Sequence, residues 1–325
     1  MNIVIIGGAG FLGQKLARAL VARGRLNGQP VRRITLADVT DPVGIEGAVP
    51  VDTVRCDITD PASVARVITD ETQVVYHLAA VVSSRAEEAF EEGIQINLHG
   101  TLNILERCRA LGTAPLLIFT SSLAVYGGEV PDPITEVSLL NPQNSYGTQK
   151  AVGELLVNDY ARKGYIDGRG VRLPTISIRP GKPNRAASSF MSSILREPLN
   201  GQWANCPVDE DFRHYYLSPR KCVENLIRVA EISAGDLGGN RILQMPGRTL
   251  SIRQMIDAMT AVAGPEPARL ITWQPEEAVR RIVGGWRFDI HADRALALGL
   301  EADGSFDENV RAYKAYPFCS GGTTC

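Results

Sequence analysis

Residues 2–13 read NIVIIGGAGFLG, and this stretch decides the fold class. Residues 2–6 form an unbroken apolar run of strand length, and residues 14–23 follow with helical periodicity before Gly24. A glycine-rich turn between a strand and a helix suits a dinucleotide, because it brings backbone amides at a helix N-terminus close to the pyrophosphate. We therefore expect this loop to bind the cofactor through Gly7, Gly10, Phe11, Leu12 and Gly13.

Strand-length apolar runs recur through the first half of the chain and alternate with helical patterns. They cover residues 33–37, 51–55, 74–78, 116–120 and 175–178. This alternation predicts an α/β fold with a doubly wound parallel sheet of the Rossmann type. We expect residues 1–180 to form the NAD-binding domain, with residues 214–235 packing back on it. Residues 181–325 are expected to form mainly a smaller, mixed substrate-binding lobe, with helices at 219–234 and 250–263 and a short strand at 270–273.

Two acidic residues lie where the adenosine half of a dinucleotide would be held. Asp38 ends the second expected strand of the sheet, where its carboxylate can accept from ribose hydroxyls and repel a 2′-phosphate, which favours NAD over NADP. Asp57 can accept from the adenine amino group while Ile58 covers the ring. A plain turn or helix-capping role for Asp57 fits the sequence equally well.

The next strand ends in small residues. Ala79, Ala80 and Val81 follow it, and we expect them to let the cofactor cross the carboxyl edge of the sheet. Asn97 opens the following helix and is a candidate for bracing the backbone around the cofactor site. His77, within the same strand, is interpreted as a packed core histidine.

A serine, a tyrosine and a lysine form the candidate catalytic group. Tyr146 and Lys150 are one helical turn apart and share a face, and Ser122 leaves the end of a strand nearby. A general base works best near neutral pH, so a tyrosine with a pKa of about 10 must lose about three pKa units, which corresponds to roughly 4 kcal/mol. Lys150 and an oxidised nicotinamide ring can supply this by stabilising the phenolate. Ser122 would hold the substrate oxygen.

Composition excludes several other classes of protein. The 325 residues are 44% hydrophobic, and 34 basic side chains nearly balance 36 acidic ones, for a net charge of −2. This argues against a nucleic-acid-binding protein, and no apolar run approaches the roughly 20 residues of a membrane span. We expect a cytosolic protein with reduced cysteines and no metal site. The apolar helices at residues 97–111 and 146–160 suggest a homodimer.

The whole pattern resembles the extended short-chain dehydrogenase/reductase superfamily, which includes nucleotide-sugar epimerases and dehydratases. The marks of this resemblance are GGAGFLG, Asp57-Ile58, HLAA, Asn97, TSSLAVYG, Tyr146-x-x-x-Lys150, Arg179-Pro180 and FRHYYLSPRKCVENL. Within the superfamily, residues 172–190 (RLPTISIRPGKPNRAASSF) resemble the D-erythronate dehydrogenases. That resemblance implies NAD-dependent oxidation of the C2 hydroxyl of a four-carbon sugar acid to 2-oxo-erythronate. It also implies that Tyr146 is the base, that Ser122 and Tyr146 contact the substrate, and that Tyr146 and Lys150 contact NAD.

A carboxylate substrate needs a cation or several donors to replace its water. The candidates are Lys182, Arg185 and Arg213, although the sequence favours an ordinary surface or interdomain charge for each of them. Trp286 is interpreted as a core residue, with a role in covering the pocket as the alternative.

Two other functions are alternatives for the same residues. A nucleotide-sugar epimerase or dehydratase would use the same serine, tyrosine and lysine with bound NAD, so the catalytic motif cannot separate it from a dehydrogenase. A non-catalytic NAD-sensing protein on this fold would have little need for Tyr146 and Lys150, both of which are present.

Overall fold

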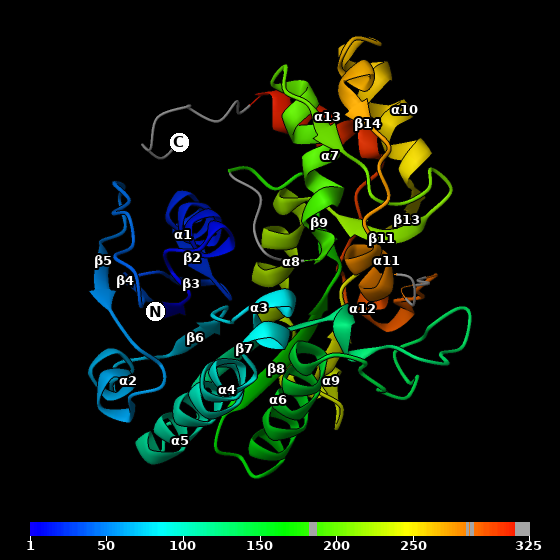
Figure 1. Cartoon of the computed structure of the whole chain (residues 1–325). Coiled ribbons are helices and arrows are strands. Elements are labelled where there is room, and N and C mark those ends of the chain that lie inside the picture. Colours follow the sequence, from blue (N-terminus) through cyan, green and yellow to red (C-terminus); the bar gives the residue numbers. More distant parts are fainter. Residues whose placement is uncertain (182–186, 284–285, 287–288, 316–325) are drawn as a thin grey trace.

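Seven parallel strands form the central sheet of this computed structural model, which describes residues 1–181, 187–283, 286 and 289–315. The spatial order is β12-β8-β7-β6-β1-β4-β5, with every neighbouring pair parallel. Figure 1 labels five of these strands, β4 to β8. The strands are β1 (Asn2–Ile6), β4 (Arg33–Asp38), β5 (Val51–Arg55), β6 (Val74–His77), β7 (Leu116–Ser122), β8 (Asp167–Leu173) and β12 (Ile242–Gln244). The predicted doubly wound parallel sheet is confirmed.

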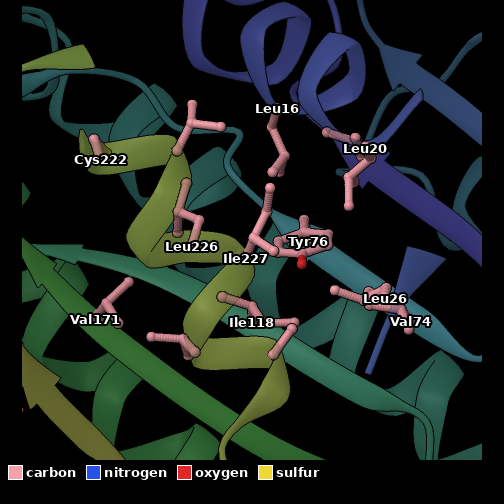
Figure 2. Packing of buried hydrophobic residues seen from close by; sticks show 14 of the residues in the cluster. Leu16, Leu20, Leu26, Val74, Tyr76, Ile118, Val171, Cys222, Leu226 and Ile227 are labelled. Carbon is pink, nitrogen blue, oxygen red and sulfur yellow. The ribbon is translucent and has the colours of Figure 1, made fainter. Parts of the chain in front are cut away.

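Helices cover both faces of this sheet because its strands are apolar on both sides. On β1, Ile3 and Ile5 point into one core and Val4 and Ile6 into the other. The first core is covered by α1 (Phe11–Arg23) and α8 (Pro219–Glu231), and Figure 2 shows their side chains meeting those of the strands. The second is covered by α2 (Pro61–Val67), α5 (Thr101–Leu111) and α6 (Ser145–Arg162). Helix α8 thus lies against the large sheet although it comes late in the sequence.

The sixth strand of the sheet is not the one the sequence predicted. Residues 175–178 were expected to fill this place, but β8 fills it, and β9 (Thr175–Ile176) pairs with β11 (Arg213–Leu217) in a separate sheet. β8 contains two arginines and an aspartate, so it does not look apolar. Their charges are paired inside the fold, since Arg169 contacts Asp167 and Arg172 contacts Glu154.

The remaining elements form a smaller group, shown together at the top of Figure 1. It includes α7 (Phe190–Leu199), β10 (Ala204–Asn205), β13 (Arg248–Ser251), α10 (Ile252–Ala263), η4 (Pro267–Leu270), β14 (Ile271–Thr272), α11 (Glu277–Val283) and α13 (Phe306–Ala315). Buried Met191, Met255, Met259 and Phe306 form part of its own core. The two helices and the short strand predicted after residue 180 are present as α8, α10 and β14, of which α8 lies against the large sheet. The domain boundary at residue 180 stays a prediction.

Short elements complete the chain. They are β2 (Arg25–Leu26), β3 (Gln29–Pro30), α3 (Ser83–Glu88), α4 (Phe90–Gly93), the π-helical turn η1 (Ile94–Gly100), η2 (Leu123–Val125), η3 (Ala187–Ser189), α9 (Ala234–Leu237) and α12 (Asp293–Ala297). Within the described ranges, none of the helices has the length and apolar character needed to cross a membrane.

Candidate active site

A cavity of about 360 Å³ opens where the chain changes direction in the sheet. After β1 the chain adds β4 and β5 on one side, then returns to add β6 on the other side of β1. Ligands of doubly wound folds bind in the crevice outside the carboxyl ends of the strands at this point. The cavity is lined there by the glycine loop, the ends of β6 and β7, the start of α6, and residues of β9 and β11.

The glycine loop has the geometry of an anion cradle. Gly7 has a φ of +89°, and a Cβ on Gly13 would lie 2.3 Å from the carbonyl oxygen of Gly7, so neither position accepts a side chain. Helix α1 begins at Phe11, three residues earlier than predicted, and its N-cap Gly10 has no side chain to occupy the first-turn amides. Those amides, with the positive end of the helix, fit a pyrophosphate.

Asp38 lies directly behind this loop. It ends β4, and its Oδ2 accepts a hydrogen bond from the backbone N–H of Ala9 at 3.0 Å. Its other oxygen, Oδ1, accepts from the backbone N–H of Thr40 at 3.2 Å. A half-buried carboxylate fixed beside the loop fits a pair of ribose hydroxyls, so the protein side of the site is suited to a dinucleotide.

Asp57 and Ile58 lie farther from the cavity and do not line it. Asp57 Oδ1 accepts from the backbone N–H of Thr59 at 2.9 Å, so its carboxylate shapes a turn, while Asp60 caps helix α2. Ile58 is buried against Gly100. The contacts of Asp57 and Ile58 with adenine stay predictions.

Asn97 connects the end of β6 to helix α6. Its Oδ1 accepts from the backbone N–H of Val81 at 2.8 Å, and its Nδ2 donates to the carbonyl of Val81 at 3.0 Å and to Gln149 Oε1 at 2.7 Å. Ala80 lines the cavity, whereas Ala79 and Val81 do not. Asn97 thus fixes the backbone that borders the cavity, and it lies in the π-helical turn η1.

Ser122, Tyr146 and Lys150 line the same cavity as the glycine loop. Ser122 is the last residue of β7, and the other two belong to the first turns of α6, which Asn144 caps by accepting from the N–H of Gly147 at 2.8 Å. Lys150 Nζ donates to the carbonyl of Thr120 at 2.8 Å and lies 5.7 Å from the centre of the Tyr146 ring. The structure therefore brings the three predicted side chains together.

The protein groups around Tyr146 do not by themselves make its phenol acidic. Burial raises it to about 12, although a hydrogen bond from Ser122 and the positive charge of Arg179 both act to lower it. Lys150, expected to make the phenol acidic, is itself affected by burial, which lowers its pKa to about 7. The protein surroundings alone thus favour the neutral phenol, and further positive charge is needed for Tyr146 to act as a base near neutral pH.

The burial of Lys150 predicts a gain in stability when it is removed. Its pKa falls from 10.5 to about 7 on folding, so the ammonium destabilises the folded state below about pH 7, and this effect disappears as the pH rises towards about 10.5. We expect Lys150→Met to raise Tm by several degrees at pH 7, with the gain shrinking towards pH 10. Thermal unfolding over this pH range measures it, with exposed Lys163→Met as the control. A variant that is less stable at every pH would show that the bond to Thr120 outweighs burial.

Several side chains that the sequence did not single out as site residues also line the cavity. Among them are Thr175, Arg179, Arg196 and His214. Thr175 Oγ1 and His214 Nε2 lie 2.7 Å apart, and burial lowers the pKa of His214 to about 3, so this pair is uncharged. Trp286 also lines the cavity and stacks on His214 with ring centres 5.4 Å apart. Arg179 and His214 were within quoted motifs, but no local pattern indicated which way they face.

The structure describes one of the three predicted carboxylate-binding residues, Arg213. Lys182 and Arg185 lie outside the described residues. Arg213 is exposed at the start of β11 and does not line the cavity, because alternation along the strand directs its neighbour His214 there instead. The roles of Lys182, Arg185 and Arg213 stay predictions.

A buried ion pair lies directly behind the site. Arg172 of β8 and Glu154 of α6 are 6% and 1% exposed, and two nitrogens of the guanidinium contact both carboxylate oxygens, with Nη2 to Oε2 at 2.7 Å. Ser121 Oγ donates to Glu154 at 2.5 Å, and Arg172 Nη1 donates to the hydroxyl of Tyr126 at 2.5 Å. This network joins β7, β8 and α6 next to Ser122.

The glycine loop and the serine, tyrosine and lysine group define a class of protein. Residues 3–214 match the model of the NAD dependent epimerase/dehydratase family. This chain belongs to that family.

More specific relatives cover nearly the whole chain. A D-erythronate dehydrogenase of Cupriavidus necator is 51% identical over 96% of this chain and 98% of its own length. A D-erythronate dehydrogenase of Haemophilus influenzae is 42% identical over 97% of this chain and 99% of its own length. Among solved structures, the nucleoside-diphosphate-sugar epimerase from Agrobacterium tumefaciens is 43% identical with a TM-score of 0.93, covering 98% of this chain and 94% of its own. The predicted resemblance to the D-erythronate dehydrogenases is confirmed.

Proposed function

We propose that this protein is an NAD-dependent dehydrogenase that oxidises the C2 hydroxyl of D-erythronate to give 2-oxo-D-erythronate. The observation that carries the proposal is that Ser122, Tyr146 and Lys150 line one cavity with the glycine loop. It is supported by the two full-length D-erythronate dehydrogenase relatives at 51% and 42% identity. The match to the NAD dependent epimerase/dehydratase family and the cradle at the start of α1 support NAD as the cofactor.

Each catalytic residue has one task in this mechanism. NAD, when bound, would supply the ring that accepts the hydride of C2 and, in its oxidised form, the further positive charge that a Tyr146 phenolate needs. The phenolate oxygen of Tyr146 takes the proton of the C2 hydroxyl, so that C2 becomes a carbonyl carbon. Ser122 holds the substrate oxygen while its charge changes. Lys150, which donates a hydrogen bond to the carbonyl of Thr120, adds positive charge near Tyr146 and would bind a ribose hydroxyl of NAD.

Formation of NADH from free D-erythronate tests the proposal. The purified protein is mixed with NAD and a panel of four- to six-carbon aldonic acids, and the absorbance of NADH is followed. We expect D-erythronate to give the highest kcat/KM. Absence of NADH formation with D-erythronate would refute the proposed reaction.

A nucleotide-sugar epimerase or dehydratase is the second candidate, because the Agrobacterium tumefaciens structure carries the name of a nucleoside-diphosphate-sugar epimerase. Such an enzyme restores its cofactor within each turnover and releases no NADH. Conversion of a nucleotide sugar without net NADH, together with no reaction of D-erythronate, would decide in favour of this function.

Asp38 predicts the choice between NAD and NADP. Its carboxylate, fixed beside Ala9, would repel a 2′-phosphate and accept from ribose hydroxyls. We expect Asp38→Ala to lower the ratio of kcat/KM for NAD to that for NADP by about tenfold or more, since a hydrogen bond to a charged group contributes about 1.5–3 kcal/mol. Initial rates with both cofactors measure the ratio, and exposed Asp52→Asn on β5 serves as the control. An unchanged ratio in Asp38→Ala would remove this residue from cofactor selection.

We also propose a cytosolic homodimer. Leu155 of α6 is 66% exposed, and an exposed apolar side chain on a helix can pack against a helix of a second subunit. Light scattering after gel filtration tests this, and a mass of one chain at micromolar concentration would contradict it.

A further inference from the structure

Two arginines, Arg179 and Arg196, line the same cavity as Tyr146, and their side chains differ in their interaction partners. The guanidinium of Arg196 already has partners, because its Nη2 contacts Glu197 at 2.5 Å and its Nη1 donates to the carbonyl of Arg179 at 2.9 Å. Arg179 is fixed through its backbone, since its N–H donates to Ser192 Oγ at 3.1 Å and its carbonyl accepts from Arg196. The Arg179 guanidinium forms no hydrogen bond or ion pair with any residue in the described part of the chain.

A partly buried guanidinium without an anion is unfavourable. Burial lowers the pKa of Arg179, the nearby charge of Arg196 lowers it further, and Tyr146 is close enough to act in the opposite direction. Leaving a buried cation unpaired has a free-energy cost that an anion with the right geometry removes. The other two described cations that line the cavity already have partners. Lys150 donates to the carbonyl of Thr120, and Arg196 contacts Glu197. Among the described lining residues, Arg179 is therefore the cation available to an anionic ligand.

The chemistry of the reaction restricts where that anion can be. In a 2-hydroxy acid the carboxylate is bonded directly to the carbon that is oxidised, so its cation has to lie next to the base that takes the hydroxyl proton. Arg179 satisfies this condition, because it lines the same cavity as Tyr146 and the two side chains are close enough for their charges to interact. Arg213 does not satisfy it, being exposed and outside the cavity lining.

We propose that Arg179 binds the carboxylate of the substrate and so selects a 2-hydroxy acid over a neutral sugar. This inference rests on the proposed function. The planar guanidinium can hold both carboxylate oxygens, which fixes the plane of C1 and thereby the direction in which the C2 hydroxyl points at Tyr146. Arg196 is a positioning residue, since it holds the carbonyl of Arg179 and is itself neutralised by Glu197.

The test compares Arg179→Met and Arg179→Lys with the wild-type protein in the presence of NAD. One readout is kcat/KM for D-erythronate. The second is binding, by calorimetry, of the D-erythronate analogue that lacks the C2 hydroxyl and of the neutral counterpart with an alcohol in place of the carboxylate. We expect Arg179→Met to lower both kcat/KM and affinity for the acid by about 100-fold, as loss of one partner of a buried charge pair does. Affinity for the neutral compound should change little, and Arg179→Lys should recover part of the loss.

Controls separate this role from damage to the fold. Arg269→Met removes an exposed arginine of η4 whose side chain is 71% exposed, and it should behave as wild type. Affinity for NAD should be unchanged in all variants. Arg213→Met is measured as a further variant. Equal binding of the acid analogue by wild type and Arg179→Met would overturn the inference, as would a loss of affinity for the acid in Arg213→Met alone. A wild-type protein that fails to oxidise D-erythronate would overturn the proposed function instead, while the calorimetry would still decide the role of Arg179.

Discussion

Replacing Tyr146 with phenylalanine is expected to lower kcat for D-erythronate oxidation by about 10³-fold, because removal of a positioned general base typically costs 10²–10⁴-fold. Phenylalanine keeps the ring and lacks only the hydroxyl, so the fold and the affinity for NAD should stay close to wild type. The rate of NADH formation at saturating D-erythronate measures the effect, and calorimetric titration with NAD measures the affinity.

Tyr160→Phe is the matched control for this experiment. Tyr160 belongs to the same helix α6, but its hydroxyl contacts Glu106 and it does not line the cavity. Its removal should leave kcat unchanged. The pH profile adds a second readout: because burial raises the pKa of Tyr146, the wild-type rate should rise with pH as the phenol ionises, and Tyr146→Phe should lose that rise. Near-normal turnover in Tyr146→Phe would exclude Tyr146 as the base.

The features that the sequence predicted well are those with a local physical cause. Residues 2–13 combine a strand period, a turn that needs glycine and a helix start, and the structure has β1, the loop and α1 there. The pairing of Tyr146 with Lys150 follows from helical spacing alone, and their nearness to Ser122 follows from a parallel sheet whose strands end at one edge.

The features that the sequence did not predict depend on partners distant in the chain. β8 was missed because Arg169 and Arg172 look exposed until the carbonyl of Val229 and the carboxylate of Glu154 are known to receive them. The three-residue strand β12 is too short for a period to show. Spacing also says nothing about burial, which raises the pKa of Tyr146 in the surroundings that the protein itself provides and outweighs the charges nearby.

Breaking the buried pair of Glu154 and Arg172 is expected to cause the largest loss of stability. Arg172→Met would leave the Glu154 carboxylate, 1% exposed, with the Ser121 hydroxyl as its only partner among the described residues. Removing one member of a buried ion pair typically costs about 3–5 kcal/mol, since the other charge stays in a poorly polarisable interior. We expect Arg172→Met and Glu154→Leu each to lower the free energy of unfolding by this amount, as measured by urea denaturation.

The double variant tests whether the loss of stability comes from an unpaired buried charge or from the loss of the two polar side chains themselves. If the loss comes from an uncompensated buried charge, Glu154→Leu combined with Arg172→Met should be more stable than either single variant, because apolar side chains of similar size then fill the gap. The exposed pair of Arg33 and Asp52 provides the control, and Asp52→Asn should change the unfolding free energy by less than about 1 kcal/mol. Additive losses in the double variant would show instead that the hydrogen bonds to Ser121 and Tyr126 stabilise this part of the fold, and that the charge pair contributes little.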